Sequence, residues 1–109
     1  MIARSAWIAT LKEDKAELYK RLHDDLPAAI AAELADKGFV RLDIYRLGST
    51  VVMTWEVDSE RVVPNRLVRE AAEREWQRIT GDCFAERWQP AELVFRLEDH
   101  AHKASQANG

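Results

Sequence analysis

The chain has 109 residues, of which 47% are hydrophobic and 32% are charged, and its net charge is −3. This length and composition are typical of one folded domain with one core. The acidic balance disfavours a general nucleic-acid-binding protein, which needs a basic face. No apolar run is long enough to span a membrane. The N-terminus lacks the apolar stretch of a signal peptide and Cys83 is the only cysteine, so we expect a cytoplasmic protein with a buried, unpaired cysteine.

The first half of the chain is predicted to form a strand, a helix and a hairpin. Residues 6–11 favour a strand, and residues 12–37 repeat leucine and isoleucine at helical spacing. Residues 39–45 and 50–57 carry strand-favouring residues in largely alternating order. The short turn around Gly48 between them predicts a β-hairpin.

The second half is predicted to contain a helix over residues 66–80, a loop over 83–92 and a strand over 93–97. The helix has mixed charges that we expect to face solvent, namely Arg69, Glu70, Glu73, Arg74 and Arg78. Residues 99–109 are polar and lack apolar periodicity, which predicts a disordered tail. A single domain is therefore expected over residues 1–98.

The order strand, helix, strand, strand, helix, strand predicts an α+β fold, the ferredoxin-like βαββαβ sandwich. In this fold two helices cover one face of an antiparallel sheet. Successive side chains of a strand point to opposite faces, so the second face carries apolar residues without cover. We therefore expect a homodimer that forms through the open face of the sheet.

Tyr19 and His23 are the strongest candidates for chemistry. They are four residues apart and share one face of a helix. Histidine transfers protons near neutral pH, and a tyrosine one turn away can donate a hydrogen bond to a ligand or to the ring. Pro27 would clash with the carbonyl of His23, so the helix is expected to bend there. The competing interpretation is a half-exposed surface histidine without a function.

Three further aromatic residues are candidates for the wall of a binding pocket. Trp76 lies on the apolar side of the second helix, where it either packs in the core or offers a flat apolar wall to a sugar. Trp88 either covers a pocket or packs under its loop, and Tyr45 belongs either to the core or to the pocket. The remaining histidines, His100 and His102, lack further ligands, so no metal site is predicted.

The residues Tyr19-Lys20-Arg21-Leu22-His23, Gly38, Ile44-Tyr45, Trp76 and Glu92-Leu93-Val94-Phe95 resemble the L-rhamnose mutarotase family. The resemblance extends from Trp7 to Leu97. It implies a dimeric α/β barrel of ferredoxin-like protomers that interconverts the α and β anomers of a 6-deoxyhexose without cofactor or metal. By this resemblance His23 is the acid/base residue, Tyr19 its companion, and Trp76 part of the sugar pocket.

Three positions depart from the family pattern. Pro27 and Glu75 stand where the family commonly has tryptophan, and Leu42 stands where it has a pocket tyrosine. The departures keep the proton-transfer pair and remove part of the expected sugar wall. Two alternatives therefore remain beside an aldose mutarotase. One is a haem-handling or oxygenase-type member of the same barrel scaffold, and the other is a relative that binds a ligand without catalysis.

Overall fold

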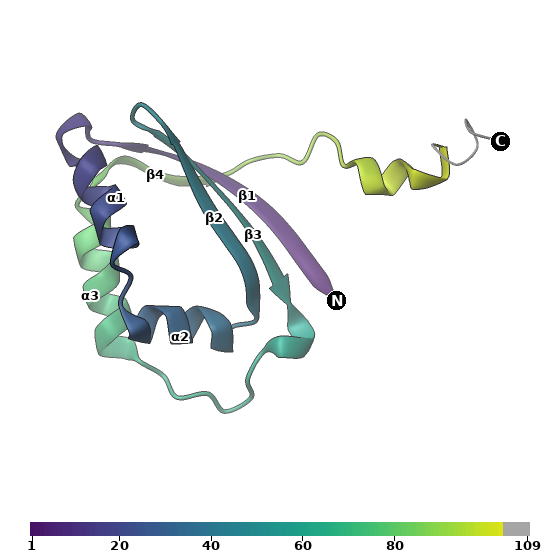
Figure 1. Cartoon of the computed structure of the whole chain (residues 1–109), viewed down its shortest axis with the longest axis horizontal. Helices are drawn as coiled ribbons and strands as arrows, with labels where there is room; N and C mark the ends of the chain where they lie inside the picture. Colours follow the sequence, from purple (N-terminus) through teal and green to yellow (C-terminus); the bar gives the residue numbers. More distant parts are fainter. Residues whose placement is uncertain (104–109) are drawn as a thin grey trace.

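The computed structural model describes residues 1–103. Four antiparallel strands form one sheet in the order β2-β3-β1-β4, and three helices lie on the same side of it (Figure 1). The strands are β1 Ile2–Leu11, β2 Phe39–Leu47, β3 Thr50–Asp58 and β4 Phe84–Pro90. The helices are α1 Ala16–Asp24, α2 Ala28–Asp36 and α3 Glu70–Gly81, with short 3-10 turns η1 Glu13–Lys15, η2 Ser59–Arg61 and η3 Leu97–His100. The predicted α+β fold is confirmed.

Strand β1 starts four residues earlier than predicted. Its pairing with β3 runs from Ile2 opposite Asp58 to Thr10 opposite Thr50. Residues 2–5 lack a clear strand pattern of their own, because Arg4 and Ser5 follow Ile2 and Ala3, but β3 supplies a full row of hydrogen-bonding partners. The predicted hairpin between β2 and β3 is present, and Gly48 has the positive φ of 60° that its tight turn requires.

The single helix predicted over residues 12–37 is wrong, because the chain forms α1 and α2 with a break between them. Pro27 stands immediately before α2, and its carbonyl accepts hydrogen bonds from the N–H groups of Ile30 and Ala31. Proline has no N–H and a fixed φ, so it suits the start of a helix better than its interior. The expected bend is therefore a complete interruption just after His23.

Helix α3 begins at Glu70, four residues later than predicted. The N–H of Arg69, which would otherwise open the helix, donates to the carboxylate of Glu33 on α2 at 3.1 Å. The predicted solvation of Arg69 and Glu73 is also wrong. Arg69 pairs with Glu33 and Asp36, and Glu73 pairs with Lys37, so these charges join α3 to α2.

The predictions for the end of the chain are wrong in two places. The expected loop over 83–92 contains β4, which pairs with β1 through a register interrupted by bulges. The expected strand over 93–97 is not a strand, because the last ladder-like contact is the bond from Ala91 N–H to the Ala6 carbonyl. Residues 84–90 form a strand because β1 pairs with them, and residues 93–97 do not because no strand lies beside them.

Beyond β4 the chain continues as the C-terminal arm, which we define as residues 91–100. Figure 1 shows the arm leaving the sheet and running away from the helices to the turn η3. The predicted boundary at residue 98 falls inside this turn. The predicted disordered tail over 99–109 stays a prediction, because residues 104–109 lie outside the described residues.

The core lies between the helices and the sheet. Its buried members are Ala9, Leu11, Ala16, Tyr19, Val51 and Cys83. Cys83 is fully buried, as expected of a packing residue, and burial raises the pKa of its thiol. Within the described part of the chain, no helix is long and apolar enough to cross a membrane.

Candidate active site

A cavity of about 750 Å³ opens between the helices and the covered face of the sheet. All three helices and the strands β2, β3 and β4 contribute to its wall. Tyr19, His23, Trp76 and Trp88, four of the five residues selected from the sequence, are among its lining residues. They come from α1, α3 and β4, so the fold brings together side chains that lie far apart along the chain.

Helix α1 fixes the orientation of His23. Its Nδ1 lies 2.8 Å from the carbonyl oxygen of Tyr19, one turn earlier. A carbonyl only accepts hydrogen bonds, so Nδ1 carries a proton and donates, and in the neutral ring the lone pair lies on Nε2. The backbone of α1 therefore selects the tautomer in which Nε2 can take a proton. Asp24 is not the orienting group, because its carboxylate pairs with Lys20.

Tyr19 is buried at the inner end of the cavity. Its ring packs against the imidazole of His23 with 4.4 Å between ring centroids, and against Phe84 at 5.4 Å. Burial raises the pKa of the Tyr19 phenol, since the charged form loses its hydration. The hydroxyl therefore stays protonated at neutral pH, which makes it a hydrogen-bond donor.

Two tryptophans continue the aromatic wall on either side of this pair. Trp76 on α3 meets the His23 ring edge-on at 5.1 Å, and Trp88 on β4 meets Phe84 at 5.5 Å. Edge-to-face packing holds such rings in place without hydrogen bonds. Trp76 therefore touches the catalytic candidate directly. Phe84 links the two halves of the wall.

The wall that the β2–β3 hairpin contributes to the cavity is apolar. Leu42 and Met53 from the hairpin line it together with Trp55, whose ring packs at right angles on Phe39 with 5.4 Å between centroids. None of these four side chains is fully buried. The cavity thus combines an apolar wall from the hairpin with the polar groups of Tyr19 and His23 from α1.

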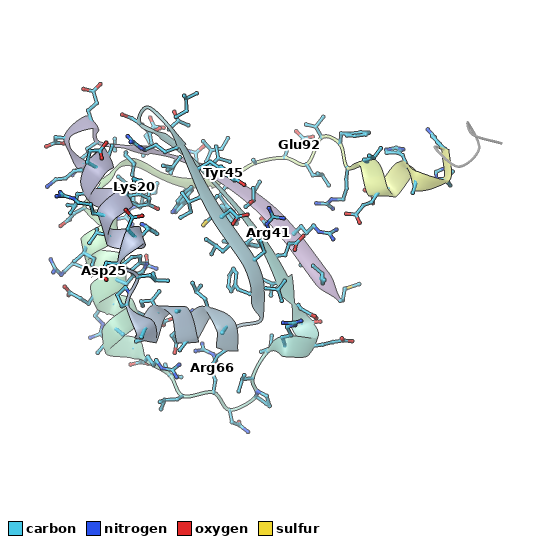
Figure 2. The ribbon with its side chains drawn as sticks, in the orientation of Figure 1. Lys20, Asp25, Arg41, Tyr45, Arg66 and Glu92 are labelled. Atoms are coloured by element: carbon cyan, nitrogen blue, oxygen red, sulfur yellow. The ribbon has the colours of Figure 1, made fainter. Side chains whose placement is uncertain are left out.

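Tyr45 is the one sequence-selected residue that does not line this cavity. Along β2 its neighbour Ile44 lines the cavity, so Tyr45 points to the opposite face of the sheet, where 59% of its surface is exposed. Figure 2 labels it on β2. Tyr45 does not line the cavity of its own protomer, and its contact with a sugar stays a prediction.

The three departures from the family pattern occupy different places. Leu42 lines the cavity, where the resemblance implies a tyrosine in the family. Glu75 lies on the outer side of α3, exposed and paired with Arg78. Pro27 lies between α1 and α2 and is absent from the wall. Only one of the three substitutions therefore alters the cavity described here.

A buried carboxylate supports the cavity from the side of α2. Glu33 is only 2% exposed, lines the cavity, and accepts hydrogen bonds from Arg66 and Arg69. Burial alone would raise its pKa, but the hydrogen bonds from the two arginines lower the pKa below the usual value. Figure 2 shows Arg66 below α2, where the 62–69 segment passes. The cluster holds this segment against the helix.

Sequence reasoning missed Glu33, Trp55 and Phe84 as site residues. The alternation of β3 gave a usable signal, since Trp55 and Met53 are two residues apart and share a face. Phe84 and Trp88 would also share a face on a strand, but β4 was predicted as a loop. Glu33 had no signal because its partners lie more than thirty residues away.

Among residues 1–103 no group of three or more histidine, cysteine, aspartate or glutamate side chains converges in a way that would hold a metal ion. The histidine at the cavity instead sits between two aromatic rings and a backbone carbonyl. The cavity thus brings one histidine and several aromatic side chains together, and charged side chains also line it. In class, the chain is an α+β sandwich with an aromatic-walled cavity that contains a histidine.

Comparison with known proteins places this class in a family. The family model for L-rhamnose mutarotase matches residues 4–102, nearly the whole chain. The chain therefore belongs to the L-rhamnose mutarotase family. No protein with a curated description matches it.

Two solved structures share the fold. An L-rhamnose mutarotase from Formosa agariphila superposes with a TM-score of 0.68 at 21% identity, over 86% of this chain and 97% of that one. A conserved protein from Methanosarcina mazei Go1 superposes with a TM-score of 0.58 at 15% identity, over 84% of this chain and 89% of that one. At these identities the matches show the fold, and the dimeric α/β barrel type of ferredoxin-like architecture is confirmed.

Proposed function

We propose that the protein is an aldose mutarotase that interconverts the α and β anomers of a 6-deoxyhexose such as L-rhamnose. The observation that carries the proposal is the position of His23: its Nδ1 is engaged by the Tyr19 carbonyl while its ring lines the cavity beside Trp76. This leaves Nε2 as a proton acceptor next to a flat apolar wall, which suits one face of a sugar ring. The apolar wall around Leu42 and Met53 suits the methyl group at C6.

The proposed reaction moves one proton in a cycle. Nε2 of His23 removes the proton of the anomeric hydroxyl while the bond from C1 to the ring oxygen breaks. The ring oxygen takes a proton from a water held by the Tyr19 hydroxyl, and that water regains its proton from His23. The product is the open aldehyde. Rotation about the C1–C2 bond and reversal of the same transfers close the ring in the other anomer.

This scheme requires no covalent intermediate and no external reductant or oxidant. General acid–base assistance of this type contributes about 10²–10⁴-fold to a rate. The buried Tyr19 phenol takes part as a hydrogen-bond donor, since its raised pKa keeps it protonated. Trp76 and Trp88 hold the sugar, and we propose no cofactor.

The test is magnetisation exchange between the anomeric protons of L-rhamnose and L-fucose, measured by NMR with the native protein and with His23→Ala. His100→Ala is the matched control, because His100 lies on the C-terminal arm, away from the cavity. Native protein and control should accelerate exchange equally, and His23→Ala should lose about 10²–10⁴-fold of the acceleration.

An unchanged rate in a folded His23→Ala variant would remove this histidine from the mechanism. No acceleration by the native protein on any of a panel of aldoses would contradict the mutarotase proposal. The family fold would then belong to a relative that binds a ligand without converting it.

A further inference from the structure

Charged side chains line the cavity, and the proposed reaction uses none of them. They are Lys20, Asp24, Glu33, Lys37, Glu73 and Arg87. Removing a charged group from water costs free energy unless the group is paired, so charges on the wall of a cavity need partners. The partners that each group already has determine how much hydrogen-bonding capacity remains for a ligand.

Most of these groups are poorly placed to bind a ligand inside the cavity. Both carboxylate oxygens of Glu33 already accept hydrogen bonds from two arginines. Lys20 and Asp24 pair with each other within α1, and 60% of each side chain is exposed. Arg87 is exposed on β4, an outer strand of the sheet. The two groups that remain are Lys37 and Glu73.

Lys37 and Glu73 form an ion pair that joins two helices at the cavity. Nζ of Lys37, at the C-terminal end of α2, lies 2.5 Å from Oε1 of Glu73 in the first turn of α3. The side chains are 38% and 32% exposed, so the pair is reached by solvent through the cavity opening but is not spread over the outer surface. The charge-assisted hydrogen bond holds the ammonium and the carboxylate side by side.

The pair keeps hydrogen-bonding capacity of both kinds. An ammonium group has three N–H donors and a carboxylate has two acceptor oxygens, and the bond between Lys37 and Glu73 uses one of each. Within residues 1–103 neither side chain has another hydrogen-bond partner. Two neighbouring hydroxyl groups can accept from the free N–H groups and donate to the free carboxylate oxygen. The chemical class that fits the pair is therefore a vicinal diol.

The position of the pair on α3 indicates which hydroxyl groups of a sugar reach it. Glu73 precedes Trp76 by three residues, so the two side chains share one face of the helix, and Trp76 contacts the ring of His23. The pair thus lies about 5 Å, one helical turn, beyond the tryptophan beside the proposed base. A pyranose with C1 at His23 and one face on Trp76 presents its opposite edge, C3 and C4, to the pair.

We propose that Lys37 and Glu73 bind the hydroxyl groups at C3 and C4 of the sugar and thereby determine which aldoses the cavity accepts. The inference rests on the proposed mutarotase function, because the direction of the sugar follows from the role of His23. A site that hydrogen-bonds a substrate hydroxyl discriminates strongly against an analogue that lacks it, since its own polar groups are then left unpaired.

The experiment measures the Kd of L-rhamnose and of its 3-deoxy and 4-deoxy analogues by quenching of tryptophan fluorescence. In the native protein, loss of either hydroxyl should raise Kd about tenfold, the effect of one hydrogen bond to a charged group. Glu73→Ala and Lys37→Met should each raise the Kd of L-rhamnose by about the same factor. Glu75→Ala is the matched control, because it also breaks a carboxylate–arginine or carboxylate–lysine type of pair on α3 but lies outside the cavity. Its Kd values should equal those of the native protein.

The combination of variant and analogue separates contact with the sugar from a purely structural role. In Glu73→Ala and Lys37→Met the deoxy analogues should bind as well as L-rhamnose does, because the partner of the missing hydroxyl is already gone. Losses that add with either analogue would mean that the pair only joins α2 to α3, and they would overturn the proposal. Unchanged Kd values for L-rhamnose in both variants would overturn it as well.

The anomer exchange rate of the native protein distinguishes a failure of this inference from a failure of the proposed function. Binding that depends on the C3 and C4 hydroxyls without accelerated exchange would support the diol site and contradict the mutarotase reaction. Accelerated exchange with additive losses would support the reaction and overturn the diol site. A native protein that binds none of the three sugars would overturn both.

Discussion

The two faces of the sheet differ in burial and in charge although the same strands build both. On the covered face, Leu11 and Val51 are buried in the core and the cavity opens beside them. On the open face, Arg4 and Glu56 form an ion pair and Tyr45 is exposed. Alternation of side chains along each strand produces this division. It separates a face with a core and a cavity from a face with exposed and paired polar groups within one small domain.

The largest expected difference between the faces is in stability, and two adjacent valines of β3 measure it. Val51 is fully buried in the core, whereas Val52 points to the open face and is half-buried. Val51→Ala should lower the free energy of unfolding by about 2–3 kcal/mol, because it removes buried methyl groups and leaves a cavity. Val52→Ala should lower the free energy of unfolding by less than half as much.

Urea denaturation of the two variants at several protein concentrations checks this comparison. An equal loss of unfolding free energy in both variants would mean that the open face is as well packed as the core. A cost of Val52→Ala that appears only at high protein concentration would sharpen the comparison, since it would show that a second copy buries this face.

A smaller difference is expected in ligand binding. Trp76 lines the cavity on the covered face, and Tyr45 lies on the open face. Trp76→Ala should raise the KM for the sugar about tenfold, which corresponds to about 1.4 kcal/mol of lost aromatic contact. Tyr45→Ala should leave KM unchanged. Saturation of the anomer exchange rate with sugar concentration gives both values, and a raised KM in Tyr45→Ala would place the open face at the sugar.

The smallest expected effect concerns acid stability and compares a buried carboxylate with an exposed one. The pKa values of both Glu33 and Glu75 are lowered from 4.5, in each case by hydrogen bonds from arginine. A lowered pKa stabilises the fold above pH 4.5, and this contribution is lost as the pH falls through the folded value. Glu33→Gln should therefore flatten the fall in stability below pH 4.5.

Glu75→Gln is the matched control. Its pair with Arg78 is exposed, and exposed pairs contribute little because water and salt screen them. Denaturant titrations from neutral pH to about pH 3, the range in which carboxylates become protonated, give the free energy of unfolding at each pH. This free energy should fall less steeply at low pH in Glu33→Gln only. Two identical profiles would mean that the arginine cluster on α2 adds nothing to acid stability.

The sequence by itself determined the class of the fold and the pair at its centre. Strand alternation and helical periodicity are local properties, so they predicted the α+β sandwich and the β2–β3 hairpin before any packing was known. The spacing of Tyr19 and His23 placed both on one helix face, because that face depends only on helix geometry. The sequence also marked Trp76 and Trp88 as wall candidates, and both line the cavity.

The tertiary structure decided what depended on distant partners. Residues 84–90 became a strand because β1 lies beside them, and residues 93–97 did not because no strand of the protomer does. Helix α3 starts at Glu70 because the N–H of Arg69 donates a hydrogen bond to the carboxylate of Glu33. The placement of Tyr45 outside the cavity followed from the register of β2. The common reason is that hydrogen-bonding partners and buried charges come from segments far apart along the chain, which local patterns do not report.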